Sequence, residues 1–278
     1  MTNYLEGLEL KTPAISSRSV IRYPGGKFRA RKILDELLPS NVRHVFSPFI
    51  GGGSFELYLT EKNIKVEAID KFLILANFWE QLSENPQLVA DGVQEYLGNV
   101  DKELFKELQE ELKNIENSLV IENKIDTAVK FLVVNRCSFS GSTLSGGFSK
   151  ESAKTRLTQT IVDKVRQWYN PHLKISYGDC HTSLQNLPPH TDLLFLDPPY
   201  LLEEEKNSLY GVSGNLHKGF DHVLLRDQVV EAGLPFLLTY NNDETVKELW
   251  KDYTIKEAEW AYGMNKSKKS SEIIITNF

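Results

Sequence analysis

The sequence is poor in cysteine, in long apolar runs and in surplus positive charge, and the first two shortages each exclude a class of protein. Its cysteines are Cys137 and Cys180. Two thiols are too few for a disulfide framework or a zinc site, so a reducing compartment is favoured. The amino terminus lacks the basic start and unbroken apolar stretch of a signal peptide, and no apolar run is long enough to span a membrane. We expect a soluble, cytoplasmic protein without a membrane partner.

The formal net charge of −6 argues mildly against a partner made of phosphate. Net charge averages over the whole surface, however, whereas a groove needs only one basic face. Basic residues gather in three clusters, at 27–32, 150–156 and 266–269. Acidic residues gather in two runs, at 107–116 and 203–205. A charge run by itself is typical of a solvated face. The clusters therefore keep nucleic acid open as a partner without establishing it.

What the sequence does contain is an alternation of short apolar runs with helical patterns. The runs predict strands at 42–47, 65–70, 174–179, 193–197, 235–240 and 272–277. The segments between them predict helices at 29–38, 55–62, 221–232 and 244–250. Strands that alternate with helices form a mostly parallel sheet covered on both faces, which is an α/β fold. Such sheets bind ligands beyond the carboxyl ends of their strands.

The stretch 85–173 breaks this alternation. "VDKELFKELQEELKNIENSL" has helical spacing, and "FSGSTLSGGFSKES" is a loop rich in glycine and serine. Long irregular loops in compact domains tend to be functional. We therefore expect a mainly helical insertion at 85–173 within a sheet domain formed by 1–84 and 174–278.

A glycine triplet follows the first predicted strand in "FSPFIGGGSFEL", with Gly51 and Gly53 at its ends. Glycines between a strand and a helix let the backbone approach a ligand and aim helix N–H groups at it. The dinucleotide fingerprint would need a glycine where Glu56 stands, so a bound pyrophosphate is not supported. An adenosine ligand without phosphates stays open, as does a plain tight turn.

Two further motifs lie beside this triplet. Asp70 closes the next strand, where an acid can accept both ribose hydroxyl protons or can simply cap a helix. "RYPGGKF" lacks the first glycine of a phosphate loop and has Phe28 in place of its serine or threonine. It still offers a turn with backbone donors and the cation Lys27, although a turn with a solvated lysine is the simpler interpretation.

The apolar run "LLFL" ends in Asp197, Pro198, Pro199 and Tyr200. Each proline fixes its own φ near −65° and pushes the preceding residue toward extended geometry, so the corner is stiff. It presents one carboxylate and one main-chain carbonyl, a pair of acceptors that matches an exocyclic amine with its two N–H donors. Tyr200 supplies a flat face for the ring that bears the amine. The alternative is an ordinary proline-rich strand exit.

Nine motifs, in order, resemble the Dam-type family of DNA adenine N6-methyltransferases: "RYPGGK", "PFIGGGS", Asp70, "NRCSFSG", "GDC", "DPPY", "FDH", "LLTYNND" and "EIIITN". The resemblance implies a Rossmann-like, mostly parallel seven-stranded sheet with a DNA-recognition insertion. It also implies S-adenosylmethionine as cofactor, double-stranded DNA as substrate and no metal. A cognate restriction endonuclease is a further partner that it suggests.

The resemblance assigns roles residue by residue. The cofactor contacts would be Tyr23, Lys27, Phe49, Gly51, Gly53, Asp70, Asp179, Cys180 and Asp197, and the catalytic corner Asp197, Pro198 and Tyr200. Two positions depart from the family: Ser47 replaces the usual acid before Pro-Phe, and "IDKF" lacks the asparagine that commonly follows the ribose acid. The implied reaction is a direct displacement by the amino nitrogen of a flipped-out adenine, which needs in-line placement and exclusion of water.

The segment "NRCSFSGSTLSGGFSK" resembles the part of the family that enters the duplex. We expect DNA contacts from Arg136, Phe139, Ser140, Ser142, Lys150 and Lys154. No arginine lies between Gly141 and Phe148 to contact a guanine edge, so a GATC site cannot be carried over. Rival hypotheses are methylation of an amine in RNA or of a glutamine side chain, and a non-catalytic nucleic-acid-binding homologue.

Overall fold

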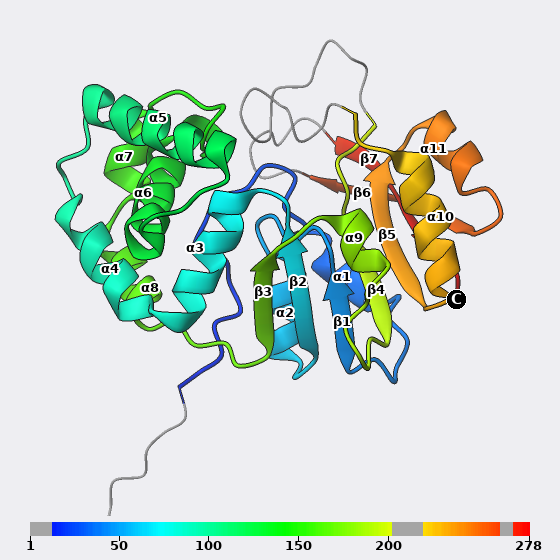
Figure 1. The fold of residues 1–278 in the computed structure, drawn as a ribbon. Coiled ribbons are helices and arrows are strands. Elements are labelled where there is room, and N and C mark those ends of the chain that lie inside the picture. The colour runs from blue at the N-terminus through cyan, green and yellow to red at the C-terminus, as the bar shows by residue number, and fades with distance from the viewer. Residues whose placement is uncertain (1–12, 202–218, 262–268) are drawn as a thin grey trace, which may run out of the picture.

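A seven-stranded sheet forms the centre of the protein, in the order β3-β2-β1-β4-β5-β7-β6. The computed structural model describes residues 13–201, 219–261 and 269–278. The five strands from β3 to β5 are parallel, and β7 is antiparallel to both of its neighbours. The strands are β1 His44–Ser47, β2 Lys65–Asp70, β3 Leu173–Tyr177, β4 Leu193–Leu196, β5 Phe236–Asn241, β6 Thr254–Ala261 and β7 Lys269–Thr276. The predicted α/β fold with a mostly parallel sheet is confirmed (Figure 1).

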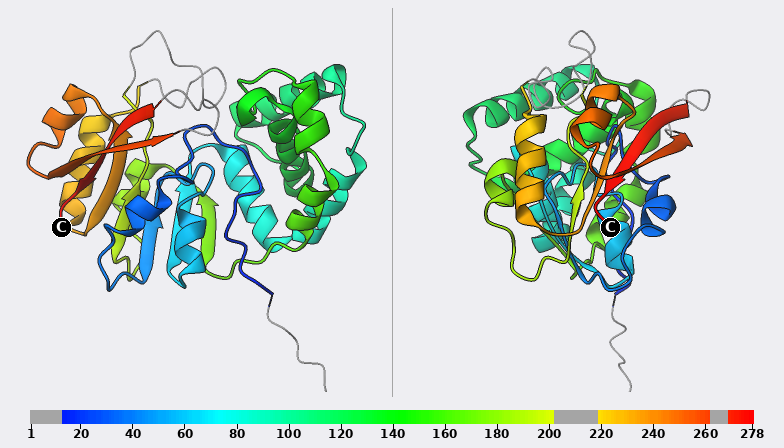
Figure 2. Two further views of the ribbon diagram at one scale, coloured as in Figure 1. Left: turned by 180° about the vertical axis from the view of Figure 1, so that it is seen from behind. Right: turned by 90° about the vertical axis from the view of Figure 1, so that its right-hand side faces the viewer.

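Helices cover both faces of the sheet, as the views from front and back show (Figures 1 and 2). Those of the sheet region are α1 Arg31–Asp35, α2 Glu56–Glu61, α3 Leu73–Glu84, α9 Cys180–Leu184, α10 His222–Ala232 and α11 Glu244–Leu249. One buried cluster joins α1, α2 and α3 to one face, and a second joins α9, α10 and α11 to the other. Since β4 is buried along its whole length between these layers, its sequence is a continuous apolar run.

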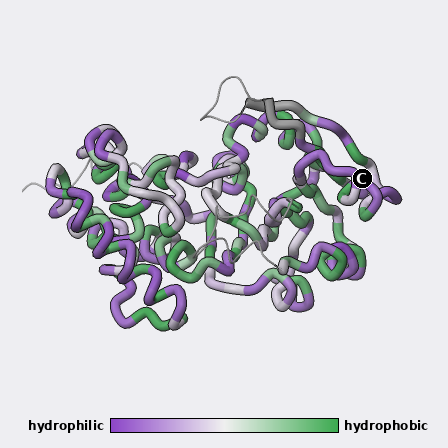
Figure 3. The backbone as a smooth tube through the Cα atoms, turned by 90° about the horizontal axis from the view of Figure 1, so that it is seen from above, coloured by the Kyte–Doolittle hydropathy of each residue, from purple (hydrophilic) through white to green (hydrophobic). Residues whose placement is uncertain are grey.

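Between α3 and β3 the chain forms the predicted mainly helical insertion. It contains α4 Pro86–Glu95, α5 Lys102–Ser118, α6 Lys124–Cys137, a 3-10 turn at Phe139–Gly141, α7 Lys150–Arg156 and α8 Gln159–Arg166. The carboxylate of Asp101 caps α5 by accepting the Leu104 N–H at 2.8 Å. Viewed from above, the insertion helices alternate between hydrophilic and hydrophobic along their length, which is the pattern of helices with one face on a core (Figure 3).

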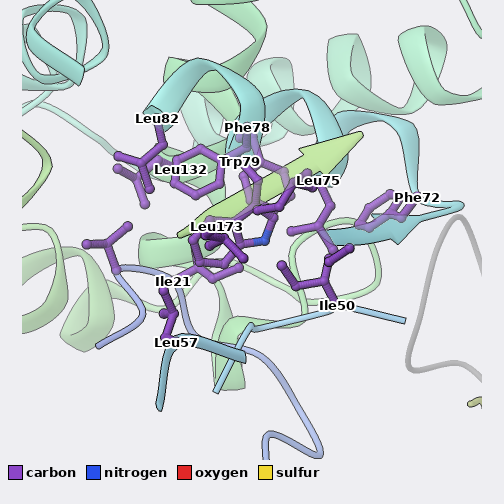
Figure 4. Packing of buried hydrophobic residues seen from close by; sticks show 14 of the residues in the cluster. Ile21, Ile50, Leu57, Phe72, Leu75, Phe78, Trp79, Leu82, Leu132 and Leu173 are labelled. Carbon is purple, nitrogen blue, oxygen red and sulfur yellow. The ribbon is translucent and has the colours of Figure 1, made fainter. Parts of the chain in front are cut away.

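The insertion and the sheet share one hydrophobic core. Phe78 and Trp79 of α3 are fully buried, and the Phe78 ring lies 5.2 Å from that of Phe131 on α6. The close-up shows this packing continuing from Leu132 of α6 through Trp79 to Leu173 of β3 (Figure 4). The division of the chain into a sheet domain and a recognition domain at residues 85 and 173 stays a prediction.

All six predicted strands and four predicted helices are present, with shifted ends, but three elements were missed: α3, α9 and β6. The helix α3 was missed because it is packed between the sheet and α6, so most of its residues are buried and its sequence is largely apolar. The helix α9 was missed because its five residues are too few to show a helical period. The strand β6 was missed because it pairs only with β7 and its described outer residues are polar and exposed. In the described part of the chain, no helix is both long and apolar enough to cross a membrane.

Candidate active site

The carboxyl ends of the parallel strands bring the predicted site residues to one edge of the sheet, the upper edge in Figure 1. The glycine turn follows β1, Asp70 ends β2, Asp179 lies two residues beyond β3, and Asp197 directly follows β4. Adjacent parallel strands place their ends side by side, so these groups meet although they are far apart in the sequence.

Asp197 stands at the stiff corner that its sequence predicts. Its Oδ1 accepts a hydrogen bond from Thr239 Oγ1 at 2.7 Å, which fixes the carboxylate against β5. Pro198 is buried, and neither proline has an N–H that could compete for an acceptor. On β7, the carboxylate of the fully buried Glu272 accepts the Tyr200 hydroxyl at 2.6 Å. The carboxylate and the tyrosine of the corner are therefore each held by a neighbouring strand.

Lys27 is the cation of this corner. Its side chain is 4% exposed, and its Nζ lies 2.7 Å from Asp197 Oδ1 and 2.8 Å from Oδ2. The ammonium also donates to the Gly25 carbonyl at 3.0 Å and lies 5.1 Å from the centre of the Tyr200 ring. Its distance to Glu272 Oε2 is 3.8 Å. The predicted cofactor lysine thus contacts the carboxylate that is predicted to be catalytic, and the roles of both residues stay predictions.

Sequence reasoning missed Thr239 and Glu272 as functional residues, although both lie in the quoted segments "LLTYNND" and "EIIITN". A signal was available in each case. Thr239 lies within the apolar run of β5, Glu272 directly precedes the three isoleucines of β7, and both side chains are fully buried. A buried polar residue in a core strand needs a partner, and for these two the partners belong to the corner.

The turn after β1 is joined directly to Asp70. The Gly51 N–H donates to Asp70 Oδ2 at 2.9 Å, and the Phe72 N–H donates to Oδ1 at 2.9 Å. Burial raises the pKa of Asp70 to about 6, although these N–H donors favour the ionised form. Gly51 and Gly53 have φ values of 46° and 64°, and the ring of Tyr23 packs directly on Gly51 and Gly52. Asp70 thus connects the glycine turn with the segment that leads into α3, and its role toward a ribose stays a prediction.

Beyond β3, Asp179 begins α9 by accepting the N–H groups of His181 and Thr182. Its Oδ2 pairs with Lys71 Nζ at 2.9 Å. Burial would raise the pKa of Asp179, but the Lys71 ammonium and the backbone donors outweigh it and hold the pKa below its ordinary value. The adjacent Cys180 is buried, which raises its thiol pKa to about 12. The sequence analysis did not predict a helix beginning at Asp179 and Cys180, and the strand predicted at 174–179 therefore ends two residues later than β3.

Phe49 and Glu56 complete the surroundings of the turn. The Phe49 ring packs edge-on against Phe220 at 5.8 Å. Glu56, at the first residue of α2, is buried and accepts a hydrogen bond from Ser47 Oγ at 2.8 Å. Burial raises the pKa of Glu56 to about 7, and the nearby Asp197 charge adds to the rise. The residue that excluded a dinucleotide fingerprint is thus a buried carboxyl group behind the corner.

The predicted DNA contacts lie along the end of α6, the following loop and α7. Phe139 is 70% exposed on the 3-10 turn, and Ser140 beside it has a φ of 60°. The buried Asn135 holds this loop, because its side chain bonds both the N–H and the carbonyl of Arg22 and also the Gly141 carbonyl. Ser142 is partly buried at the end of the turn, and Lys150 and Lys154 are exposed on α7.

Arg136 lies with Arg22 and Arg156 in a cluster of positive charge. In the described structure its Nε is buried without a hydrogen-bond partner. Burial lowers the pKa of Arg136 to about 10, and the charges of Arg22 and Arg156 lower it further. Arg22 in turn donates to Ser138 O and Ser152 Oγ, each at 3.3 Å, which connects the loop with α7. Uncompensated guanidinium groups of this kind suit an anion.

The strand order, the reversed β7 and the ligand groups at the strand ends define a Rossmann-like α/β protein of the methyltransferase type. Comparison with known families is specific: residues 23–264 match the D12 class of N6 adenine-specific DNA methyltransferases. The chain belongs to this family, and the predicted enzyme class is confirmed.

The chain is similar to one curated relative and to two solved structures. The chain is 25% identical to the Type II methyltransferase M1.LlaDCHI of Lactococcus lactis subsp. cremoris, over 97% of this chain and 98% of the relative. It resembles the structure of precorrin-6y C5,15-methyltransferase from Geobacter metallireducens GS-15 with a TM-score of 0.39 and 13% identity, covering 90% and 87% of the two chains. A SAM-dependent methyltransferase from Agrobacterium tumefaciens matches with a TM-score of 0.39 and 13% identity, covering 90% and 60%.

Proposed function

We propose that this protein transfers a methyl group from S-adenosylmethionine to N6 of an adenine that is flipped out of duplex DNA. The observation that carries the proposal is the Asp197 carboxylate, which Thr239 orients and which a donor with several N–H groups, the Lys27 ammonium, already occupies. An adenine amino group offers N–H donors to the same acceptors. Lys27 must yield that position when the base enters.

The residues of the corner divide the work. Asp197 accepts one amino N–H and the Pro198 carbonyl the other, which draws the nitrogen lone pair away from the ring and makes it nucleophilic. Tyr200, fixed through its hydroxyl by Glu272, stacks on the base. The new N–C bond forms as the C–S bond breaks, and the nitrogen loses one proton, for which Asp197 is the nearest base.

The residues beside the corner fit an adenosine-type cofactor. Asp70 accepts N–H groups of its own backbone surroundings, but a carboxylate has roughly four lone-pair positions, so it can also accept a ribose hydroxyl. Tyr23, Lys27, Phe49, Gly51, Gly53, Asp179, Cys180 and Asp197 remain the predicted contacts around it. S-Adenosylmethionine supplies a methyl carbon on a sulfonium, which needs no further activation than in-line placement.

We propose that Phe139, Ser140 and Ser142 enter the duplex and that Arg136, Lys150 and Lys154 bind its phosphates. The exposed Phe139 ring and the Arg136 Nε, which is buried without a hydrogen-bond partner in the described structure, support this assignment. Flipping a base costs about a few kcal/mol, which phosphate contacts must offset. A cognate restriction endonuclease also stays a prediction, and the Type II name of the Lactococcus relative is its support.

The test is the substitution Asp197→Ala. We expect it to abolish methyl transfer, because no acceptor then orients the amine, while S-adenosylmethionine still binds and the chain still folds. Tritium incorporation from labelled cofactor into duplex DNA, ribosomal RNA and protein measures the transfer, and calorimetric titration measures cofactor binding. Modification-sensitive sequencing then identifies the methylated base and its context.

The exposed Asp227→Ala on α10 serves as the matched control, because it removes an aspartate far from the corner. Full activity of Asp197→Ala would refute the role of the corner. Label in RNA or protein but not in DNA would overturn the proposed substrate and favour the rival enzymes.

A further inference from the structure

Glu272 is a buried acid whose function is not explained by the reaction as described so far. Its side chain is fully buried on β7, opposite Asn241 of β5. The carboxylate accepts the Tyr200 hydroxyl at 2.6 Å, and its Oε2 lies 3.8 Å from Lys27 Nζ. A charge removed from water requires an opposite charge or strong hydrogen bonds nearby.

Lys27 faces two acids and is closer to one of them. Its ammonium lies within 2.8 Å of both Asp197 oxygens, about 1 Å nearer than it lies to Glu272. It also lies over the Tyr200 ring, at 5.1 Å from the centre. The ammonium therefore occupies both places that the proposed adenine needs, the carboxylate and the aromatic face.

Displacing Lys27 creates a problem of charge. A 4% exposed ammonium that loses its carboxylate partner would be left buried and unpaired, which is strongly unfavourable. Glu272 is a second acid that the ammonium can reach, so the ammonium need not be left unpaired. A shift of about 1 Å brings Nζ from its present separation to ordinary ion-pair distance from Glu272.

We propose that Glu272 is the positioning residue that receives Lys27 when the target adenine takes Asp197. The inference rests on the proposed function. Lys27 pairs with Asp197 when the base is absent and with Glu272 when the amino group is bound, so the buried ammonium keeps a carboxylate partner in both states. The exchange favours bases that carry an amino group, because only these donate a hydrogen bond to Asp197 in place of the lost ammonium.

The competing explanation is that Glu272 only orients Tyr200 through the hydroxyl. In our proposal Glu272 acts through Lys27, whereas in the competing explanation it acts through Tyr200. Double-mutant cycles with each of these residues therefore separate the two explanations. The variants are Glu272→Gln, Lys27→Met and Tyr200→Phe, together with the two double variants that contain Glu272→Gln. Glu257→Gln, which neutralises an exposed acid on the neighbouring β6, is the matched control.

Equilibrium binding is the primary measurement, since Lys27→Met can itself lower turnover. The probes are duplexes carrying either adenine or unsubstituted purine at the mapped target position, bound with a non-reactive cofactor analogue. The ratio of the two dissociation constants reports recognition of the amino group. The KM values for DNA and for S-adenosylmethionine are measured beside it, and thermal unfolding confirms that each variant folds.

We expect Glu272→Gln to lower the preference for adenine about tenfold and to raise the KM for DNA, with the KM for S-adenosylmethionine unchanged. In the Lys27→Met background the same substitution should have no further effect, whereas in Tyr200→Phe it should keep its full effect. The inference would be overturned if Glu272→Gln lowered the preference for adenine equally with and without Lys27. It would also be overturned if the effect of Glu272→Gln disappeared in the Tyr200→Phe background. Absence of DNA methylation by the unmodified protein would instead refute the proposed function, so the two failures are distinguishable.

Discussion

A single residue, Gly51, connects the turn after β1 with both Asp70 and Tyr23. Its φ of 46° belongs to the left-handed region, and a Cβ built on it would lie 2.8 Å from the Tyr23 ring. Its N–H bonds Asp70, and its carbonyl accepts the Trp79 indole N–H at 3.0 Å. Any movement that relieves a side chain here therefore disturbs the acid proposed to bind ribose.

We expect Gly51→Ala to lower the free energy of unfolding by about 1–3 kcal/mol and to weaken binding of S-adenosylmethionine. Gly147→Ala is the control, because a Cβ at Gly147 meets nothing within 4 Å. That variant should stay within about 0.5 kcal/mol of the parent. Urea unfolding and cofactor titration measure the two effects, and unchanged cofactor affinity in Gly51→Ala would contradict the assignment of the turn.

At the scale of elements, the start of α2 places a carboxyl group behind the active corner. Burial raises the pKa of Glu56 from 4.5 to about 7. As the pH rises above the ordinary value, the unfolded chain loses this proton first, so the folded state is destabilised progressively until the pH passes the folded pKa. The difference between the pKa of 4.5 in the unfolded chain and the folded pKa of about 7 corresponds to a loss of about 3 kcal/mol in the free energy of unfolding.

We expect Glu56→Gln to remove this loss, because the neutral amide keeps an acceptor for Ser47 but cannot ionise. Urea unfolding at about pH 5 and about pH 8 should show a stability gain confined to the higher pH. Glu61→Gln, an exposed acid on the same helix, should leave the pH dependence unchanged. A gain of equal size at both pH values would show that ionisation of Glu56 is not its cause.

At the scale of the whole molecule, a net charge of −6 coexists with the Arg22, Arg136 and Arg156 cluster and the exposed lysines of α7. Binding to a polyanion must therefore depend on one face. Each phosphate contact lowers the slope of log affinity against log salt by roughly 0.9.

Changing Lys150 and Lys154 together to Met should reduce the magnitude of the salt slope by roughly two and weaken all DNA sequences alike. The matched control changes to Met Lys247 of α11 and Lys251, which follows that helix; the two have the same spacing, and α11 lies at the other end of the molecule in Figure 1. Fluorescence anisotropy across a salt series measures both slopes. An equal change in the control would mean that total charge, rather than this face, determines the affinity.

Sequence reasoning predicted the class of fold, six of its seven strands and the stiff corner after β4. These follow from local physics, because alternating elements restrict the topology and two consecutive prolines fix the backbone wherever they stand. The turn at Gly51 and the strand end at Asp70 were likewise predictable, because both features depend on residues that are close together in the sequence.

The pairing of charged groups, in contrast, became visible only in the folded protein. Lys27 and Asp197 are 170 residues apart, and nothing local in "YPGGKF" distinguishes a solvated lysine from one that pairs with a buried acid. Thr239, Glu272 and Glu56 likewise acquire their partners through the packing of β5, β7 and α2 around the corner. The physical reason is that burial and electrostatic pairing depend on distance in space, which strand order and helix packing set and which sequence separation does not report.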